Sequence, residues 1–133
     1  MITAKRSRKR RRVFARTLLA AIDASKTLGI RAGTRPHRVI GIWVVVVAGR
    51  VFVRSWDIKE RGWYRTFLDE PEGVIHIAER EVAVRASRAP GERLQAAIDR
   101  AYAAKYNTPG SLTYVRGFAR GRRRATTTEL TPL

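Results

Sequence analysis

Cations and indoles occur close together between residues 35 and 63 of this 133-residue chain. The candidates for binding a ligand are Arg35, Arg38, Arg54, Ser55, Lys59, Arg61, Trp56 and Trp63. An arginine guanidinium binds phosphate through two parallel hydrogen bonds, and a serine hydroxyl adds a further donor. Indole rings stack on other planar rings. These residue types favour a site for a flat, phosphorylated ligand; the alternatives are solvated surface cations and tryptophans that serve only packing.

The chain shows no pattern of catalytic side chains. It lacks Gly-x-Ser-x-Gly, a phosphate-binding loop ending in Gly-Lys-Ser/Thr, and His-Glu-x-x-His. It has no cysteine, which excludes disulfides, thiolate catalysis and cysteine-based zinc sites and fits a reducing cytoplasm. We therefore expect no catalytic residue of the chain itself, no metal site and a cytoplasmic protein. This absence does not exclude an enzyme, because in a cofactor-dependent enzyme the cofactor carries the chemistry and the protein supplies position and electrostatics.

The charge is strongly and unevenly basic. The net charge is +17, and eight cations fall within the first 16 residues, before the first acidic residue at Asp23. Such a one-signed polar run predicts a disordered arm over residues 1–12. Residues 5–16 could contact nucleic acid or another polyanion, which makes a non-catalytic binding protein the alternative function. A second group of cations lies near the C-terminus, at Arg116, Arg120, Arg122, Arg123 and Arg124.

Two runs rich in β-branched and aromatic residues flank Gly49 and predict a hairpin with strands at 38–47 and 50–56. The first run is apolar on both faces, which predicts a central strand covered on both sides. The second run alternates, so Val51 and Val53 should face one way and Phe52, Arg54 and Trp56 the other. This hairpin would project cations and indoles from its end.

The remaining patterns predict alternating classes of element. A helix is expected from Val13 with Gly29 as its stop, then a loop over 31–37, a short helix over 63–70 closed by Pro71, and a hairpin over 73–78 and 81–85. A helix follows Pro90, and 125–130 could add a strand that closes the sheet. We expect one α+β domain over 13–133, with a mostly antiparallel sheet that could form a barrel. No apolar run is long enough to span a bilayer.

Three segments resemble proteins of the flavin- and deazaflavin-binding split-barrel superfamily, which includes pyridoxamine-phosphate-oxidase-like and deazaflavin-dependent nitroreductase-like proteins. Gly33-Thr-Arg-Pro-His-Arg38 resembles the basic turn that enters their first barrel strand. Val53-Arg-Ser55, with Trp63-Tyr64 and Pro71 after it, resembles a second stretch. Asp99 to Tyr106 and Ala125 to Pro132 resemble the closing segment of a small bacterial family of unknown function.

The resemblance implies a split β-barrel with flanking helices, a homodimer, and FMN or a deazaflavin as cofactor, with the cofactor carrying hydride to an unknown substrate. It implies that basic segments come together to bind the cofactor phosphate, and that Trp56 and Trp63 border its ring. Thr66 stands where the deazaflavin enzymes have asparagine. A structural domain that has lost its cofactor therefore remains a third hypothesis.

Overall fold

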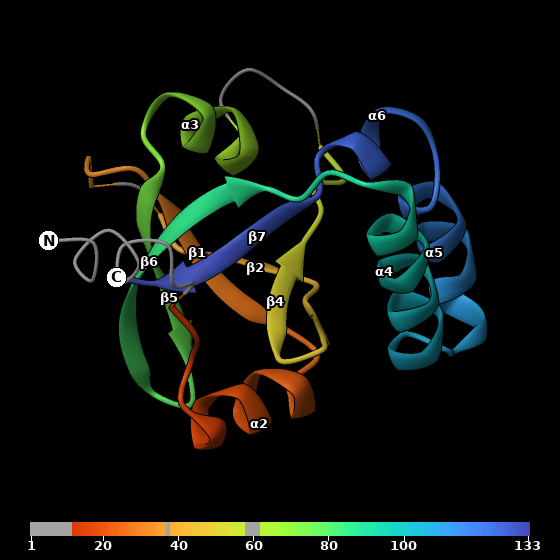
Figure 1. Cartoon of the computed structure of the whole chain (residues 1–133), viewed down its shortest axis with the longest axis horizontal. Helices are drawn as coiled ribbons and strands as arrows, with labels where there is room; N and C mark the ends of the chain where they lie inside the picture. Colours follow the sequence, from red (N-terminus) through yellow and green to blue (C-terminus); the bar gives the residue numbers. More distant parts are fainter. Residues whose placement is uncertain (1–11, 37, 58–61) are drawn as a thin grey trace, which may run out of the picture.

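The computed structural model describes residues 12–36, 38–57 and 62–133 (Figure 1). Within them, one seven-stranded sheet has the order β2-β1-β5-β6-β7-β4-β3, and every neighbouring pair is antiparallel. The strands are β1 (Leu28–Ala32), β2 (Ile40–Ile42), β3 (Val45–Val47), β4 (Arg50–Val53), β5 (Glu72–Ile77), β6 (Arg80–Arg88) and β7 (Thr128–Pro132). The expected α+β class with a mostly antiparallel sheet is confirmed.

The sheet curls into a split barrel, and chain connectivity shows why. Its two edge strands, β2 and β3, are joined by only Trp43 and Val44. Three Cα–Cα steps can separate Ile42 from Val45 by no more than about 11 Å. The two edges of a seven-stranded sheet can lie this close only when the sheet bends round on itself.

Both expected hairpins form, each with a two-residue turn. Val47 pairs with Arg50 across Ala48 and Gly49, whose φ angles are 52° and 75°. Ile77 pairs with Arg80 across a second turn that also has two positive φ angles. Two consecutive positive φ angles match the right-handed twist of the flanking strands, so these turns hold the register of β3–β4 and β5–β6.

The single central strand expected over 38–47 was wrong. This run supplies both edge strands instead, and the break falls at Val44, whose backbone N–H donates to the Tyr106 hydroxyl at 3.0 Å. A side chain from the residue after α4 (Glu92–Lys105) thus takes the hydrogen bond that a continuous strand would have used. Both faces of β4 are buried: Val51 and Val53 face the barrel interior and Phe52 faces the opposite side, as the alternation predicted.

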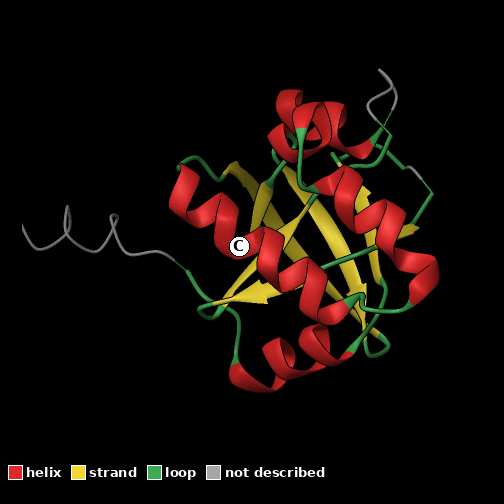
Figure 2. Ribbon diagram, turned by 90° about the vertical axis from the view of Figure 1, so that its right-hand side faces the viewer, coloured by secondary structure: helices red, strands yellow, loops and turns green. Residues whose placement is uncertain are grey.

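Two apolar cores result from this arrangement. The first fills the barrel and is covered by α2 (Arg16–Ala24) and α3 (Trp63–Asp69). The second lies between the outer face of β3–β4 and the helices α4 (Glu92–Lys105) and α5 (Leu112–Phe118), which face the viewer in Figure 2. Ile98 and Tyr102 of α4 are fully buried there, which confirms the apolar stripe predicted for this helix.

Several elements differ from the sequence predictions. Gly29 does not end the first helix, which stops at Ala24; it lies inside β1, and this strand includes Arg31 and Ala32 of the expected loop. The helices α5 and α6 (Gly121–Ala125) and the short turn of 3-10 helix at Pro109–Ser111 were not expected. The terminal strand forms three residues later than predicted and pairs with both β6 and β4.

The predicted basic arm falls almost wholly outside the described residues; Arg12 is described and exposed. None of the helices in the described ranges is long and apolar enough to cross a membrane.

Candidate functional site

A cavity of about 480 Å³ lies where the break between β2 and β3 meets the end of β4. The first residue of α3 and two residues of α5 complete its wall. We call this cavity the aromatic pocket; its lining residues are Ile40, Gly41, Ile42, Trp43, Arg54, Ser55, Trp56, Asp57, Gly62, Trp63, Tyr114 and Phe118. Four residues predicted to bind a ligand, Arg54, Ser55, Trp56 and Trp63, therefore line one cavity.

Aromatic rings in mutual contact give this pocket its shape. Trp43 is stacked on Tyr106, with centroids 4.0 Å apart and planes 5° from parallel. Tyr114 makes edge contacts with Trp43 at 6.0 Å and with Trp56 at 4.8 Å. Phe118 lies 5.5 Å from the Trp56 ring. Because each indole is braced by other rings, the pocket presents a fixed apolar wall to a planar guest.

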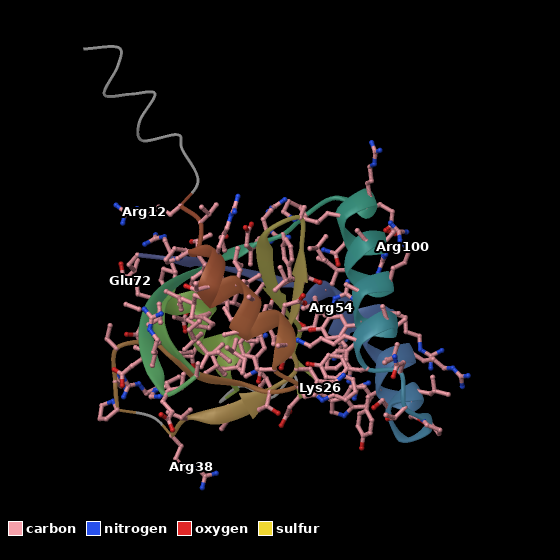
Figure 3. All side chains as sticks on the ribbon, turned by 90° about the horizontal axis from the view of Figure 1, so that it is seen from below. Arg12, Lys26, Arg38, Arg54, Glu72 and Arg100 are labelled. Carbon is pink, nitrogen blue, oxygen red and sulfur yellow. The ribbon has the colours of Figure 1, made fainter. Side chains whose placement is uncertain are left out.

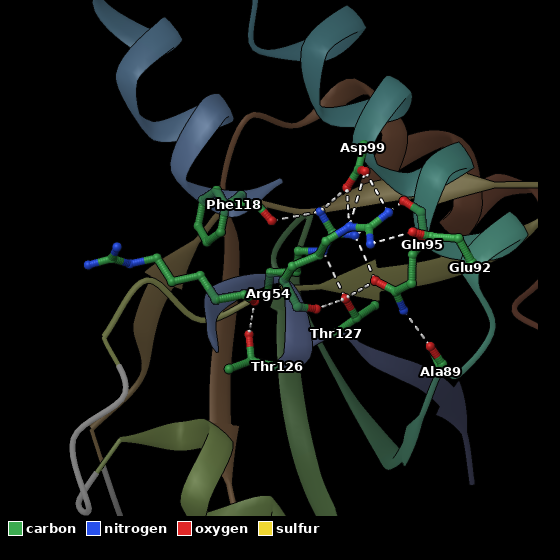
Figure 4. A network of polar contacts seen from close by, with 10 residues as sticks. Arg54, Ala89, Glu92, Gln95, Asp99, Phe118, Thr126 and Thr127 are labelled. Carbon is green, nitrogen blue, oxygen red and sulfur yellow. Dashed lines mark hydrogen bonds and ion pairs between the residues drawn. The ribbon is translucent and has the colours of Figure 1, made fainter. Parts of the chain in front are cut away.

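The structure gives Arg54 a different role from the one predicted. Its side chain is completely buried, and all three guanidinium nitrogens donate to acceptors of the chain (Figure 4). The partners are the Thr127 hydroxyl at 2.8 Å, the Asp99 carboxylate at 2.6 Å, the Phe118 carbonyl at 2.9 Å and the Gln95 side-chain oxygen at 2.8 Å. These donors are committed to the protein, so we assign Arg54 to the wall of the pocket and not to a phosphate.

The Arg54 network extends through a second arginine. Arg124 donates to the same Asp99 carboxylate at 2.9 Å and to Glu92 at 2.7 Å. The hydrogen bonds from Arg124 lower the pKa of Glu92, and those to Glu92 and Asp99 raise the pKa of Arg124. The network ties Arg54, which follows β4, to α4, α6 and the start of β7, and so fixes the segment that carries Ser55 and Trp56.

Ser55 and Trp56 are both held by the segment around α6. The Ser55 N–H donates to the Thr126 hydroxyl at 2.8 Å, and its own hydroxyl donates to the Asp57 carbonyl. Arg123 donates from Nε to the Trp56 carbonyl at 2.8 Å and places its guanidinium 3.7 Å from the centroid of the indole. This close cation–π contact leaves Trp56 with one face covered by a cation.

Arg123 is a site residue that sequence reasoning did not single out. It was noted only as one of a C-terminal group of arginines, and nothing in its spacing indicated that it would stack on Trp56. Its Nε is engaged, whereas its two terminal nitrogens have no partner among the described residues. A cation with spare donors therefore lies beside the aromatic pocket.

The other predicted cations are not part of the pocket wall. Arg35 and Arg38 are exposed and do not line the cavity, and Figure 3 shows Arg38 projecting from the body of the protein while Arg54 lies inside. Lys59 and Arg61 lie outside the described residues. Trp63 begins α3 and is 8% exposed, with most of its surface packed in the barrel core.

Across the described ranges, no cluster of three or more histidine, aspartate or glutamate residues is arranged to hold a metal ion. What the pocket offers is shape and apolar contact; its charged lining residues are Asp57 and the fully engaged Arg54, and the Arg123 guanidinium lies beside it.

Comparison with known proteins identifies the family. The model of a family described as an uncharacterized protein conserved in bacteria (DUF2255) matches residues 18–130, and the chain belongs to this family. No match was found among the curated proteins.

Two solved structures share the fold at low sequence identity. The conserved hypothetical protein Rv2991 from Mycobacterium tuberculosis has a TM-score of 0.54 and 12% identity, and the match covers 92% of this chain and 81% of that one. An FAD-binding protein from Mesorhizobium loti has a TM-score of 0.52 and 12% identity, with 88% and 87% of the two chains covered. The split-barrel fold expected from the sequence is confirmed.

Proposed function

We propose that this protein binds a flavin-type cofactor, FMN or a deazaflavin, in the aromatic pocket and acts as a small oxidoreductase. The observation that carries the proposal is a cavity of about 480 Å³ bordered by Trp43, Trp56 and Trp63, with the Arg123 guanidinium stacked on Trp56. Its volume lies in the range of about 300–1,000 Å³ common for sites that take organic ligands.

The residues present fit such a group in two respects. The braced aromatic wall suits a planar ring system, and both Trp56 and Trp63 contribute to the pocket lining. The spare donors of Arg123 suit a phosphate, and the sequence has two further cations, Lys59 and Arg61, between Trp56 and Trp63. When bound, the cofactor would supply hydride transfer, while the chain positions the ring and excludes water.

The fold supports the proposal, because the chain shares it with a structure described as an FAD-binding protein.

A titration tests the proposal. Purified protein is mixed with FMN and, separately, with a deazaflavin, and quenching or spectral shift of the ring is followed. We expect saturable binding that Trp56→Leu weakens and that Arg123→Gln weakens for the phosphorylated ligand more than for the unphosphorylated flavin. Arg100→Gln, which removes an exposed cation of α4, is the charge-matched control. Absence of saturable binding by either ligand would exclude the proposed cofactor site.

We propose further that the protein is a homodimer, with the copies meeting near the mouth of the aromatic pocket. Ile40 and Tyr114, which line this pocket, keep 38% and 47% of their surface exposed, and Val39 beside them keeps 43%. A second copy covering these side chains would bury apolar surface and close the pocket. Light scattering should give twice the chain mass, and Tyr114→Lys should lower it, whereas a monomeric wild type rejects the dimer.

The alternative function is polyanion binding through residues 5–16. Of the cations in this segment, Arg12 and Arg16 are described; both are exposed, and neither has an acidic partner among the described residues. Affinity for a polynucleotide that falls steeply with salt and disappears on deletion of residues 1–12 would support this function. Affinity that survives the deletion would reject it.

A further inference from the structure

A second and larger cavity lies at the end of the barrel beneath α3. It encloses about 760 Å³ and shares no lining residue with the aromatic pocket. We call it the α3 cavity. The helices α3 and α6 lie at the same end of the sheet (Figure 1), and residues of both line it together with the ends of β6 and β7.

The strand pattern shows that this cavity continues the barrel interior. Val84 and Ala86 of β6 are buried in the barrel core, and Arg88 follows at the next position of the same face. Across the sheet, Arg88 is paired with Thr128 at the start of β7. The apolar filling of the barrel therefore stops at Ala86, and a cation takes the following inward position at the rim.

The cavity wall divides into an apolar side and a basic rim. The apolar side consists of Phe67 and Leu68 from α3, Ala86 from β6 and Ala89 just after it. Leu68 keeps 54% of its surface exposed, which is high for a large apolar side chain. An exposed leucine beside a hollow of this size provides contact surface for an apolar guest.

The charged residues of the lining indicate which class of ligand the α3 cavity can bind. Two arginines line the cavity, and Arg124 is already bound to the carboxylates of Asp99 and Glu92. Arg88 has no hydrogen-bond or acidic partner among the described residues. Among the described lining residues Glu92 is the only carboxylate, and Arg124 neutralises it. The guanidinium of Arg88 is therefore available to a ligand, and it lies beside the apolar side of the cavity.

We propose that the α3 cavity binds a small amphipathic monoanion, in which a carboxylate or sulfonate on a flat apolar body pairs with Arg88. The apolar body lies against α3, and the anionic group remains at the wetter rim. A guanidinium binds either acid group through two parallel hydrogen bonds, so the charge and shape of the ligand, and not its particular acid, determine recognition. This site is separate from the aromatic pocket and does not depend on a cofactor there.

The test compares two fluorescent probes of nearly equal shape, the anion anilinonaphthalene sulfonate and the neutral phenylnaphthylamine. We expect saturable binding of the anion by the native protein, with the neutral probe weaker by about tenfold or more. Arg88→Gln should weaken the anion by about tenfold and leave the neutral probe unchanged. Arg100→Gln, the charge-matched control on α4, should leave the affinity for the anion within about twofold.

Two further variants locate the probe. Ala125→Trp fills the α3 cavity from α6 and should abolish binding of both probes, while Tyr114→Ala, in the aromatic pocket, should change neither. The anion should also raise the melting temperature of the native protein, which binding to a loosened state would not do. The proposal is overturned if Arg88→Gln and Arg100→Gln behave alike, or if Tyr114→Ala removes binding. Arg88 is exposed, so this comparison stands even if Ala125→Trp does not fold.

Discussion

Replacing Arg54 with methionine tests how much the buried polar network contributes to stability. Arg54 is completely buried and supplies four close hydrogen bonds, three to side chains of Asp99, Gln95 and Thr127 and one to the Phe118 carbonyl. Methionine retains most of the apolar stem but removes all of these hydrogen-bond donors. Removing one partner of a buried ion pair costs about 3–5 kcal/mol.

We expect the loss of stability caused by Arg54→Met to lie at the lower end of this range, because two of the acceptors have other neighbours. Asp99 keeps its bond to Arg124 at 2.9 Å, and the Thr127 hydroxyl, which has one proton to share between the Gln95 side-chain oxygen at 2.7 Å and the Arg124 carbonyl at 2.6 Å, stays in place. We therefore expect a loss of about 3 kcal/mol, a large share of the roughly 5–15 kcal/mol typical of a folded domain. With a urea m-value of about 1–3 kcal/mol/M, the unfolding midpoint should fall by about 1 M or more.

The assay is equilibrium unfolding in urea, followed by tryptophan fluorescence and far-UV circular dichroism. Arg100→Met is the matched control, because Arg100 projects into solvent from α4 (Figure 3). Arg54→Lys keeps the charge without the planar fork and should fall between wild type and Arg54→Met. A loss below about 1 kcal/mol for Arg54→Met, no larger than that of the control, would refute the reasoning.

Three other substitutions follow from local geometry. In Gly117→Ala the new Cβ would lie 2.5 Å from the Trp56 ring, so thermal unfolding should show a loss of about 1–3 kcal/mol and the tryptophan emission should shift; unchanged emission would contradict this contact. Ala48→Asn places a residue tolerant of positive φ in the turn and should raise stability in urea by about 0.5–1 kcal/mol, whereas a loss would contradict the turn geometry. Burial raises the pKa of Tyr102, so the unfolded state loses its phenolic proton first, and stability should fall above about pH 10 by up to about 1.4 kcal/mol per pH unit from this group. Tyr102→Phe should remove that part of the alkaline loss and should change neutral-pH stability little, because the hydroxyl has no partner in the described part of the chain; identical alkaline profiles would reject the assignment.

Local patterns were sufficient to predict much of the fold. Alternating apolar residues and two-residue turns predicted both hairpins, and the two faces of β4 were assigned correctly from Val51, Val53 and Phe52. The periodic stripe of α4 was also correct, because its apolar residues pack on a single sheet face. In these segments sequence pattern and tertiary packing favour the same structure.

The errors occurred where distant residues decide local structure. The split of 40–47 depends on Tyr106, which is 62 positions beyond Val44. Gly29 resembled a helix stop, yet it lies in β1 because this strand pairs with β2 and β5 on its two sides. Neither contact can be inferred from a local window of sequence.

The candidate site shows the same division. The sequence predicted that Ser55, Trp56 and Trp63 would lie together, and they line one cavity. It could not indicate that Arg54 would be buried against Asp99 and Gln95, which are 45 and 41 positions away. Nor could it indicate that Arg123 would stack on Trp56. The sequence was sufficient to predict the residue types and charges of the site. Which hydrogen-bond donors are already engaged within the protein could be determined only from the three-dimensional structure.

The central claim is that the aromatic pocket holds the ring of a flavin-type cofactor. The most direct measurement is a crystal structure of the protein with whichever of FMN or a deazaflavin it binds in solution. We predict the ring in the cavity between Trp56 and Trp63, with its phosphate within hydrogen-bonding distance of Arg123 or of the loop between β4 and α3. A ring bound in the α3 cavity, or elsewhere on the surface with the aromatic pocket empty, would contradict the account.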